Sequence, residues 1–513
     1  MEEETWNVIN SYFEKNKTWM ASHQINSYND FVNNKIPSIF KSNNLSSVYV
    51  YDKEDKSITY QLDFYICGEK ANKYKICLPS IYNHEKEEMK PMIPNEARLK
   101  NLTYGFDMFI DLEVKVSMKK GNEYVYQNRK LEKDDFLKNI YLGNIPIMLR
   151  SDMCVLNKVD PSAYPEFGES KYEFGGYFII DGREKMIICQ ERKAENILFL
   201  EKINDNKIDK IVEVKSKSDE AFTHARTIKL QLEHSGCITV RLGQQKAFIR
   251  EYEGRDIPLF IMFRFLGVET DKEILELICG DLDTELSNKL VDLLRPSIMD
   301  PVIKKFNVYD KQMAENYLEP LTSRSQTDIT GNKLKEIQKN KLERLSFLYD
   351  SITEVLLPQV GRDLVHKRYY LAYMTKKLLL LELGLENITK RDNFMNKRID
   401  VTGFMLSNLF KDALNQTLYN AKREIKRKYE FNYKEFSGAN FVNIINENNY
   451  YKFFDNTVFK KQFIDSLKKG NIGNKIGVVQ QLDRINYYST LSHIRRITDP
   501  VTGNEVVDDR RRL

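Results

Sequence analysis

The hydrophobic residues of this chain change their spacing several times along its length. Near the N-terminus four large apolar residues recur at helical spacing, namely Trp6, Ile9, Tyr12 and Phe13. The run Ile110–Val116 instead alternates apolar and charged residues, which predicts a strand covered on one side. With 513 residues, the chain also exceeds what one hydrophobic core accommodates. We therefore predict a multidomain α+β protein with mixed sheets and helices.

The same patterns predict further elements. Further strands are predicted at Val48–Tyr51, Ile58–Leu62, Tyr74–Ile76, Arg226–Leu232, Cys237–Leu242 and Ile485–Tyr488. Further helices are predicted at Tyr28–Phe40, Lys272–Cys279, Leu334–Leu357, Tyr369–Leu383 and Met405–Arg427. Pro358 ends the third of these helices, because proline cannot continue the hydrogen-bond pattern. Taken alone, the basic segment Pro94–Tyr104 favours a surface loop.

Composition and cysteine usage restrict the class of protein. No apolar run reaches the ~18 residues that a membrane span requires, and the acidic start Met1–Glu4 is unlike a signal peptide. The six cysteines are dispersed and form no Cys-x-x-Cys pair, which argues against a zinc site and favours reduced, mostly buried thiols. We therefore expect a soluble, intracellular protein with no membrane partner and no metal site.

Residues Phe174–Arg192 have the pattern of a β-hairpin. Two apolar strands flank Asp181–Gly182, where the glycine can adopt the positive φ that a tight turn requires. Gly175–Gly176 precede a strand rather than joining a strand to a helix, and their spacing fits no nucleotide-binding loop. This hairpin is therefore predicted to be structural.

Polar residues of a particular kind are concentrated in Gly477–Arg484 and Tyr488–Arg496. Small hydroxyl groups, amides, one histidine and three arginines occur together there, which suits a surface that grips a sugar-phosphate backbone. The two runs closely resemble the fork of the second-largest (beta-type) subunit of multisubunit DNA-directed RNA polymerases.

Three other segments match the same family. The hairpin run, Gly175–Arg192, resembles the point where the family's protrusion passes into its lobe, and Pro94–Tyr104 resembles a protrusion segment. Arg391–Gly403 resembles a third family motif, in which Asn396, Lys397 and Arg398 precede a helix that can hold phosphate oxygens at its start. The alternative for this third segment is a structural hinge.

The resemblance implies a domain order. Residues 1–187 correspond to the first part of the protrusion, 188–400 to the lobe, 401–465 to the second part of the protrusion, and 466–513 to an incomplete fork. Within the fork, 470–474 match the first fork loop and 499–505 the second. Family members continue for several hundred residues beyond the position of Leu513, so we expect an N-terminal portion that was either split naturally or truncated.

The resemblance also implies contacts with nucleic acid. The RNA–DNA hybrid moves by one base pair per cycle, so its contacts must be made to repeating phosphates and sugars rather than to base edges. The residues implied in such contacts are Lys475, Gln480, Arg484, Arg495, Arg496, Lys397 and Arg398. Lys475, Arg484 and Arg496 are predicted to neutralise phosphates, whereas His493 and Asp483 are predicted to hold the fork together.

No catalytic or metal-binding residue of the family falls on this chain. The resemblance implies Mg²⁺ at the active centre of the holoenzyme, no cofactor bound by this chain, and no activity of the chain in isolation. Implied partners are the DNA template, the hybrid, the largest subunit, a polypeptide carrying the rest of the second-largest subunit, and other polymerase subunits. The alternative is a stand-alone nucleic-acid-binding or regulatory protein derived from the same fold.

The divergent sequence, rich in Asn, Lys, Ile and Tyr, suggests an AT-rich genome such as that of a large DNA virus or a protist. The expected location is the nucleus, or a cytoplasmic viral factory or virion.

Overall fold

The computed structural model describes most of the chain. The described residues are 2–15, 18–51, 58–83, 87–120, 123–130, 137–203, 205–218, 225–242, 256–318, 348–349, 352–390, 392–436, 440–441, 444–446, 449–454, 456–473 and 475–499. They form two compact units: Met1–Arg192 together with Ile399–Leu513, and Lys193–Arg398. Helices and small sheets occur in both, which confirms the α+β multidomain class. The names and boundaries of protrusion, lobe and fork stay predictions.

The first unit begins with helices and continues into an antiparallel sheet. The helices are α1 (Glu2–Lys15), α2 (Ser22–Asp30) and α3 (Ile36–Ser42). The sheet has the order β1-β2-β7-β8, formed by Leu45–Tyr51, Ile58–Ile66, Leu112–Lys120 and Glu123–Lys130. Leu112, Val114 and Val116 are buried while the charged residues between them are half-buried, so the predicted one-sided strand is confirmed from Leu112 onward. Ile110 instead ends the preceding strand, β6.

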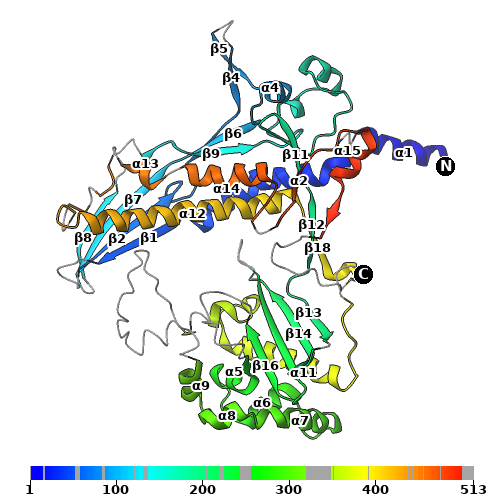
Figure 1. The fold of residues 1–513 in the computed structure, drawn as a ribbon, viewed down its shortest axis with the longest axis vertical. Coiled ribbons are helices and arrows are strands. Elements are labelled where there is room, and N and C mark those ends of the chain that lie inside the picture. The colour runs from blue at the N-terminus through cyan, green and yellow to red at the C-terminus, as the bar shows by residue number, and fades with distance from the viewer. Residues whose placement is uncertain are drawn as a thin grey trace. The chain divides into compact units, whose positions relative to one another are not determined.

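A long helix, α12 (Thr402–Phe431), packs against this sheet and against α2 and α14 (Asn456–Lys469), as Figure 1 shows. It confirms the helix predicted over Met405–Arg427 and extends it at both ends. Phe410 lies at the centre of an aromatic cluster, with its ring 5.7 Å from that of Phe40 and 5.4 Å from that of Phe459. Edge-to-face rings at these separations add to the stabilisation from burial.

Helix α2 forms hydrogen bonds both with α12 and with the end of the hairpin. Gln24 is fully buried, and its amide donates a hydrogen bond to the Ile187 carbonyl (3.2 Å) while its oxygen accepts one from the Thr402 hydroxyl. The amide N–H of Gly403 donates to Ser27 Oγ at 2.8 Å. A Cβ atom on Gly403 would overlap the carbonyl oxygen of Ser27, so only glycine permits this approach of the two helices.

Four further small sheets lie in the first unit, and two of their strands, β12 and β18, include residues at the boundary with the second unit. Their orders are β10-β11-β19, β18-β12-β20, β3-β6-β9 and β4-β5. The strands are β3 (Tyr74–Cys77), β4 (Ser80–Asn83), β5 (Glu88–Pro91), β6 (Gly105–Ile110), β9 (Ile140–Pro146), β10 (Phe178–Ile180), β11 (Arg183–Ile187), β12 (Cys189–Lys193), β18 (Lys397–Asp400), β19 (Val479–Gln481) and β20 (Ile497–Thr498). Strands β10 and β11 confirm the predicted hairpin, and its turn has φ values of 47° at Asp181 and 72° at Gly182. Two successive positive φ values are those of a type I′ turn.

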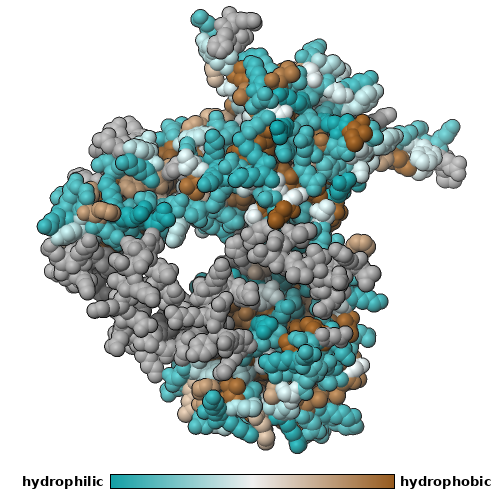
Figure 2. All heavy atoms as spheres, in the orientation of Figure 1, coloured by the Kyte–Doolittle hydropathy of each residue, from teal (hydrophilic) through white to brown (hydrophobic). Residues whose placement is uncertain are grey.

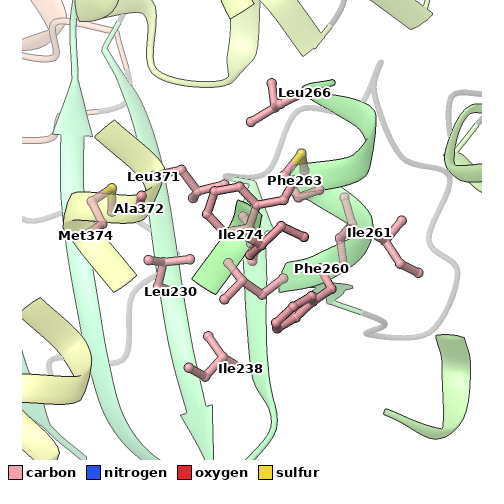
Figure 3. Packing of buried hydrophobic residues seen from close by; sticks show 14 of the residues in the cluster. Leu230, Ile238, Phe260, Ile261, Phe263, Leu266, Ile274, Leu371, Ala372 and Met374 are labelled. Atoms are coloured by element: carbon pink, nitrogen blue, oxygen red, sulfur yellow. The ribbon is translucent and has the colours of Figure 1, made fainter. Parts of the chain in front are cut away.

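The second unit pairs an antiparallel sheet with helices. The sheet runs in the order β13-β14-β15-β16-β17, formed by Leu198–Lys202, Ile208–Ser216, Arg226–Glu233, Ile238–Leu242 and Ile257–Pro258. The helices are α5 (Leu259–Phe265), α6 (Asp271–Cys279), α7 (Glu285–Ile298), α8 (Pro301–Phe306), α9 (Lys311–Leu318) and α11 (Leu364–Glu382). Figure 3 shows Leu230 of the sheet, Phe263 of α5 and Leu371 of α11 in one hydrophobic core.

Some predicted elements differ from the structure. Pro94–Leu99 forms helix α4 rather than a loop, with the Glu96 carboxylate accepting a hydrogen bond from the backbone N–H of Ile93 at its start (3.4 Å). Residues 485–488 are not a strand, since helix α15 begins at Tyr487. Most of the helix predicted over 334–357 lies outside the described residues.

The thiols follow the prediction in part. Cys67, Cys154, Cys189 and Cys279 are buried, whereas Cys77 is exposed. Burial raises the pKa of Cys189 to about 11, so its thiol stays protonated and unreactive at neutral pH. Among the described helices, none is long and apolar enough to cross a membrane. The face displayed in Figure 2 is predominantly hydrophilic, with scattered hydrophobic side chains.

Candidate nucleic-acid interface

The C-terminal polar segment is attached to the hairpin that lies about 300 residues earlier in the sequence. Strand β19 pairs antiparallel with β11, placing Gln480 opposite Met186. The backbone N–H of Leu482 continues the contact by donating to the carbonyl of Glu184 at 3.0 Å. Helix α15 (Tyr487–Ile494) follows, capped by Asn486. Two of the motifs identified in the sequence therefore form a single piece of structure.

Arg484 is held by carboxylates from this hairpin region. Its Nε lies 2.7 Å from Glu184 Oε2, and its Nη2 lies 2.8 Å from the hydroxyl of Tyr177 and 3.4 Å from Glu173 Oε2. The guanidinium also stands over the Tyr177 ring at 5.0 Å. Arg484 therefore already has acidic partners within the chain, although 41% of its side chain remains exposed.

Arg98 of α4 approaches the same groups from the other side. Its Nε lies 2.9 Å from Glu184 Oε1, its Nη2 donates to the Tyr177 hydroxyl at 2.9 Å, and its Nη1 pairs with Glu169. We call these six residues the arginine–carboxylate cluster: Arg98, Glu169, Glu173, Tyr177, Glu184 and Arg484. Tyr177 is fully buried, so the cluster joins α4, the hairpin and the C-terminal segment through its centre.

Electrostatics in the cluster follow from burial and pairing. Burial opposes ionisation of Glu184, but the hydrogen bonds and charges of Arg484 and Arg98 outweigh it and hold the pKa of Glu184 below its ordinary value. At Glu169 the effect of burial is larger than the effect of the ion pair with Arg98, so the pKa of that carboxyl is raised. Glu184 is accordingly the charged bridge between the two arginines.

Gln480 belongs to a chain of hydrogen bonds. Its amide nitrogen donates to the Gly477 carbonyl at 3.0 Å, and its oxygen lies 3.2 Å from His493 Nε2. The backbone N–H of Asp483 donates to His493 Nδ1 at 3.1 Å. Since Nδ1 accepts, Nε2 must carry the proton of the neutral imidazole and donate to Gln480. The chain fixes both the histidine tautomer and the orientation of the amide.

The remaining basic residues of the C-terminal segment differ in their surroundings. Lys475 Nζ lies 3.4 Å from Asp400 Oδ2, and Arg192 Nε lies 2.5 Å from the other oxygen of that buried carboxylate. Arg495 is exposed, donates to the Met20 carbonyl at 3.2 Å and lies 6.0 Å from the Trp19 ring. Arg496 is exposed on the same turn.

Comparison with known proteins supports one family. A family model described as RNA polymerase beta subunit matches residues 20–446. The chain belongs to the RNA polymerase beta subunit family. It is 30% identical to DNA-directed RNA polymerase II subunit RPB2 of Schizosaccharomyces pombe, over 98% of this chain and 39% of that protein. It is 27% identical to DNA-directed RNA polymerase subunit Rpo2N of Methanothermobacter thermautotrophicus, over 98% of this chain and 88% of that protein. The chain thus spans about two-fifths of the length of the RPB2 proteins that it matches.

Lys397 and Arg398 of this beta-family chain belong to the second unit. They lie on strand β18 and not in the first turn of α12, so a helix N-terminus is not what positions them. Lys397 Nζ lies 3.7 Å from Asp392, and Arg398 is exposed, with its guanidinium donating to the carbonyls of Met395 and Lys397. The contact of all seven predicted residues with nucleic acid stays a prediction. The second fork loop, from residue 500 onward, lies outside the described residues.

Sequence reasoning missed four of the six cluster residues. Tyr177 and Glu184 belong to the hairpin run that resembles the family, and Glu169 and Glu173 precede that run; none of the four was predicted as a site residue. Arg98 was noticed in a basic segment but assigned to a loop. An available signal was the apolar run Phe174–Ile180, which has Glu169 and Glu173 before it and Glu184 after it.

The family implies Mg²⁺ at the polymerase active centre. Within the described residues, no group of three or more His, Cys, Asp or Glu side chains is arranged to hold a metal ion. The described residues therefore offer no donor set for that metal.

A pH dependence follows from His493. Burial, followed by the charge of Arg496, lowers the pKa of its imidazole below the ordinary value of 6.5. The folded state then binds fewer protons at His493 than the unfolded state does. The contribution of the neutral imidazole to stability is therefore fully present above about pH 6.5 and is lost as the pH falls below that value.

We expect His493→Ala to lower the free energy of unfolding by about 2 kcal/mol at neutral pH, because the Asp483 N–H loses its acceptor. Urea unfolding at pH 7.5 and 5.5 measures both effects.

The matched control is His493→Asn, whose side-chain oxygen can replace Nδ1 as an acceptor but does not titrate. This variant should lose less stability between the two pH values than the unaltered chain does. Equal losses in the two proteins would show that His493 does not carry the pH dependence.

Proposed function

We propose that this chain is the N-terminal part of the second-largest subunit of a DNA-directed RNA polymerase. In this role it forms one side of the DNA cleft, grips the RNA–DNA hybrid and template during transcription, and supplies no catalytic residue. The observation that carries the proposal is the pairing of the 475–499 segment with the hairpin, which brings two segments that resemble family motifs together in one structure. Its partners are nucleic acid, the largest subunit, the polypeptide with the rest of this subunit, and other polymerase subunits, in an intracellular setting.

The basic residues of the C-terminal segment differ in whether their charges are already paired, and this difference predicts which of them contact phosphate. Arg495 and Arg496 are exposed, so each can neutralise a phosphate and release a counterion. Arg484 is paired with Glu184, and Lys475 with Asp400, so much of each charge is already compensated. Gln480 carries no charge, and its amide is engaged within the segment. Phosphate contact should therefore depend most on Arg495 and Arg496.

Dissociation of stalled elongation complexes over a salt series tests this proposal. Arg496→Ala should reduce the salt slope by about one ion, equally on all template sequences, because the contact is to backbone. Arg484→Ala should change the slope by clearly less than one while lowering thermal stability. Gln480→Ala should leave the slope unchanged, since an amide releases no counterion. An unaltered slope for Arg495→Ala and Arg496→Ala in folded enzyme would contradict the assignment.

The absence of catalytic residues is tested separately. The purified chain, given template, nucleotides and Mg²⁺, should make no RNA, whereas the assembled enzyme should. Template-dependent incorporation by the chain alone would overturn that part of the proposal.

A further inference from the structure

Strand β1 is an edge strand of the four-stranded sheet in the first unit. Its seven residues, Leu45–Tyr51, pair with β2 on one side, and within the described part of the chain no strand pairs with the other side. A strand of this length with an open edge presents a row of backbone donors and acceptors. Such edges bind extended peptides that add as a further strand.

The register of β1 and β2 tells which groups face outward. Leu45 is opposite Tyr65 and Ser47 opposite Asp63, and the Ile66 N–H donates to the Asn44 carbonyl at 2.9 Å. In an antiparallel pair, hydrogen-bonded pairs alternate with non-bonded ones. Residues 46, 48 and 50 therefore bond to β2, whereas the N–H and C=O groups of residues 45, 47 and 49 point away from the sheet.

Helix α12 extends the surface beyond this edge. Val48 and Val50 are buried, and Val50 lies opposite Tyr60, whose ring is 5.7 Å from that of Tyr429 on α12. This face of β1 therefore lies against α12, which runs beside β1 in Figure 1. Beside the start of β1 there is a pocket of about 250 Å³, whose lining includes Ser42, Leu45, Ser46, Asn415, Tyr419 and Lys422. The last three of these lie on one face of α12, at i, i+4 and i+7. Leu45 and Tyr419 are 57% and 51% exposed, so a strand added to β1 would cover them.

Lys422 supplies the charge of this pocket. It is half-buried, and no carboxylate in the described chain lies within ion-pair distance of it. Burial, and then the charge of Lys426, lowers the pKa of Lys422, in keeping with a half-buried ammonium that has no acidic neighbour. A carboxylate placed in the pocket would provide that partner.

We propose that the outer edge of β1 binds an extended segment of another polypeptide of the polymerase assembly, which adds as a fifth strand and places an acidic side chain beside Lys422. Backbone bonds to residues 45, 47 and 49 hold the segment, and the pocket selects its side chain. The inference rests on the proposed function, because the partner is taken to belong to the assembled enzyme.

Amide hydrogen exchange at single-residue resolution tests the inference in the purified assembly. The amides of Ser47 and Tyr49 should exchange at least tenfold more slowly in the assembly than in the chain alone, whereas those of Ser46, Val48 and Val50 should be protected in both. Ser47→Pro removes one outward N–H and no backbone bond to β2, and an edge strand tolerates proline. It also removes the hydrogen bond from the Ser47 hydroxyl to Asp63 Oδ1, which the matched Ser47→Ala variant removes as well. It should abolish the extra protection at Tyr49. Ser47→Ala, which keeps the N–H, should retain it.

The charge is tested by Lys422→Gln, which should abolish the protection, with Lys426→Gln, at an exposed lysine one turn later, as the matched control that retains it. Outward amides that exchange without protection in an intact assembly would overturn the inference and leave the proposed function standing. Equal protection in the chain alone, or a second copy of this chain at the edge by native mass spectrometry, would overturn it as well. Recovery of the chain with no polypeptide bound would overturn both proposals.

Discussion

Replacing Arg98 with Met is expected to lower the free energy of unfolding of the first unit by about 3 kcal/mol. Arg98 is only 18% exposed, and its partners Glu169 and Glu184 are 4% and 17% exposed. Removing the arginine leaves these carboxylates near each other with one cation fewer, and it removes a donor from the buried hydroxyl of Tyr177. The cost therefore comes mainly from uncompensated buried charge rather than from the loss of one bond.

Urea unfolding followed by tryptophan fluorescence measures this effect, because Trp6 and Trp19 are the two tryptophans of the chain and both lie in the first unit. The matched variant is Arg484→Met, which should cost less, since 41% of that side chain is exposed and solvent screens the remaining charge. Adding Glu169→Gln to Arg98→Met should recover part of the loss. If Arg98→Met changed the free energy of unfolding by less than about 0.5 kcal/mol, the cluster would contribute no more than an ordinary surface ion pair, and the prediction would be wrong.

The second large effect is expected at Gly403, where alanine should destabilise a helix that it would usually strengthen. An exposed Gly→Ala exchange inside a helix gains about 1 kcal/mol. At Gly403 the added Cβ would overlap the backbone carbonyl of Ser27. This carbonyl is part of α2, so the overlap can be relieved only if α2 shifts away from α12. We expect a loss of about 3 kcal/mol, or failure to recover folded chain.

Two variants separate this clash from other causes. Gly473→Ala, at a glycine with a φ of 59° and no atom within 4 Å of the added Cβ, should cost only about 1 kcal/mol of backbone strain. Ser27→Ala combined with Gly403→Ala should not restore stability, because the obstructing atom belongs to the backbone. A stable Gly403→Ala protein with unchanged amide exchange in α2 would show that the two helices can separate without cost.

Arg484 illustrates the limit of inference from a motif. Its sequence context predicted a residue that neutralises a phosphate, and that role stays a prediction. The structure adds that Glu184 and Glu173 are already bound to its guanidinium. The sequence separation between these partners is about 300 residues, and no local pattern indicates which arginine meets which glutamate.

Local patterns determined much of this protein without any tertiary information. Alternation in Leu112–Val116 and helical spacing in Met405–Arg427 predict elements that the structure confirms, because a period of two or of 3.6 residues is a property of the backbone itself. The Asp181–Gly182 turn belongs to the same class, since glycine permits the φ it needs. The family motifs were equally visible in the sequence.

Tertiary structure alone decided the rest. Pro94–Leu99 became a helix and 487–494 became another, because end capping and packing override the weak preferences of short segments. The arginine–carboxylate cluster, the approach of Gly403 to Ser27 and the open edge of β1 each depend on residues far apart in the chain. Sequence determines the period of an element and the charge of a side chain, but burial and pairing are fixed only when distant segments meet.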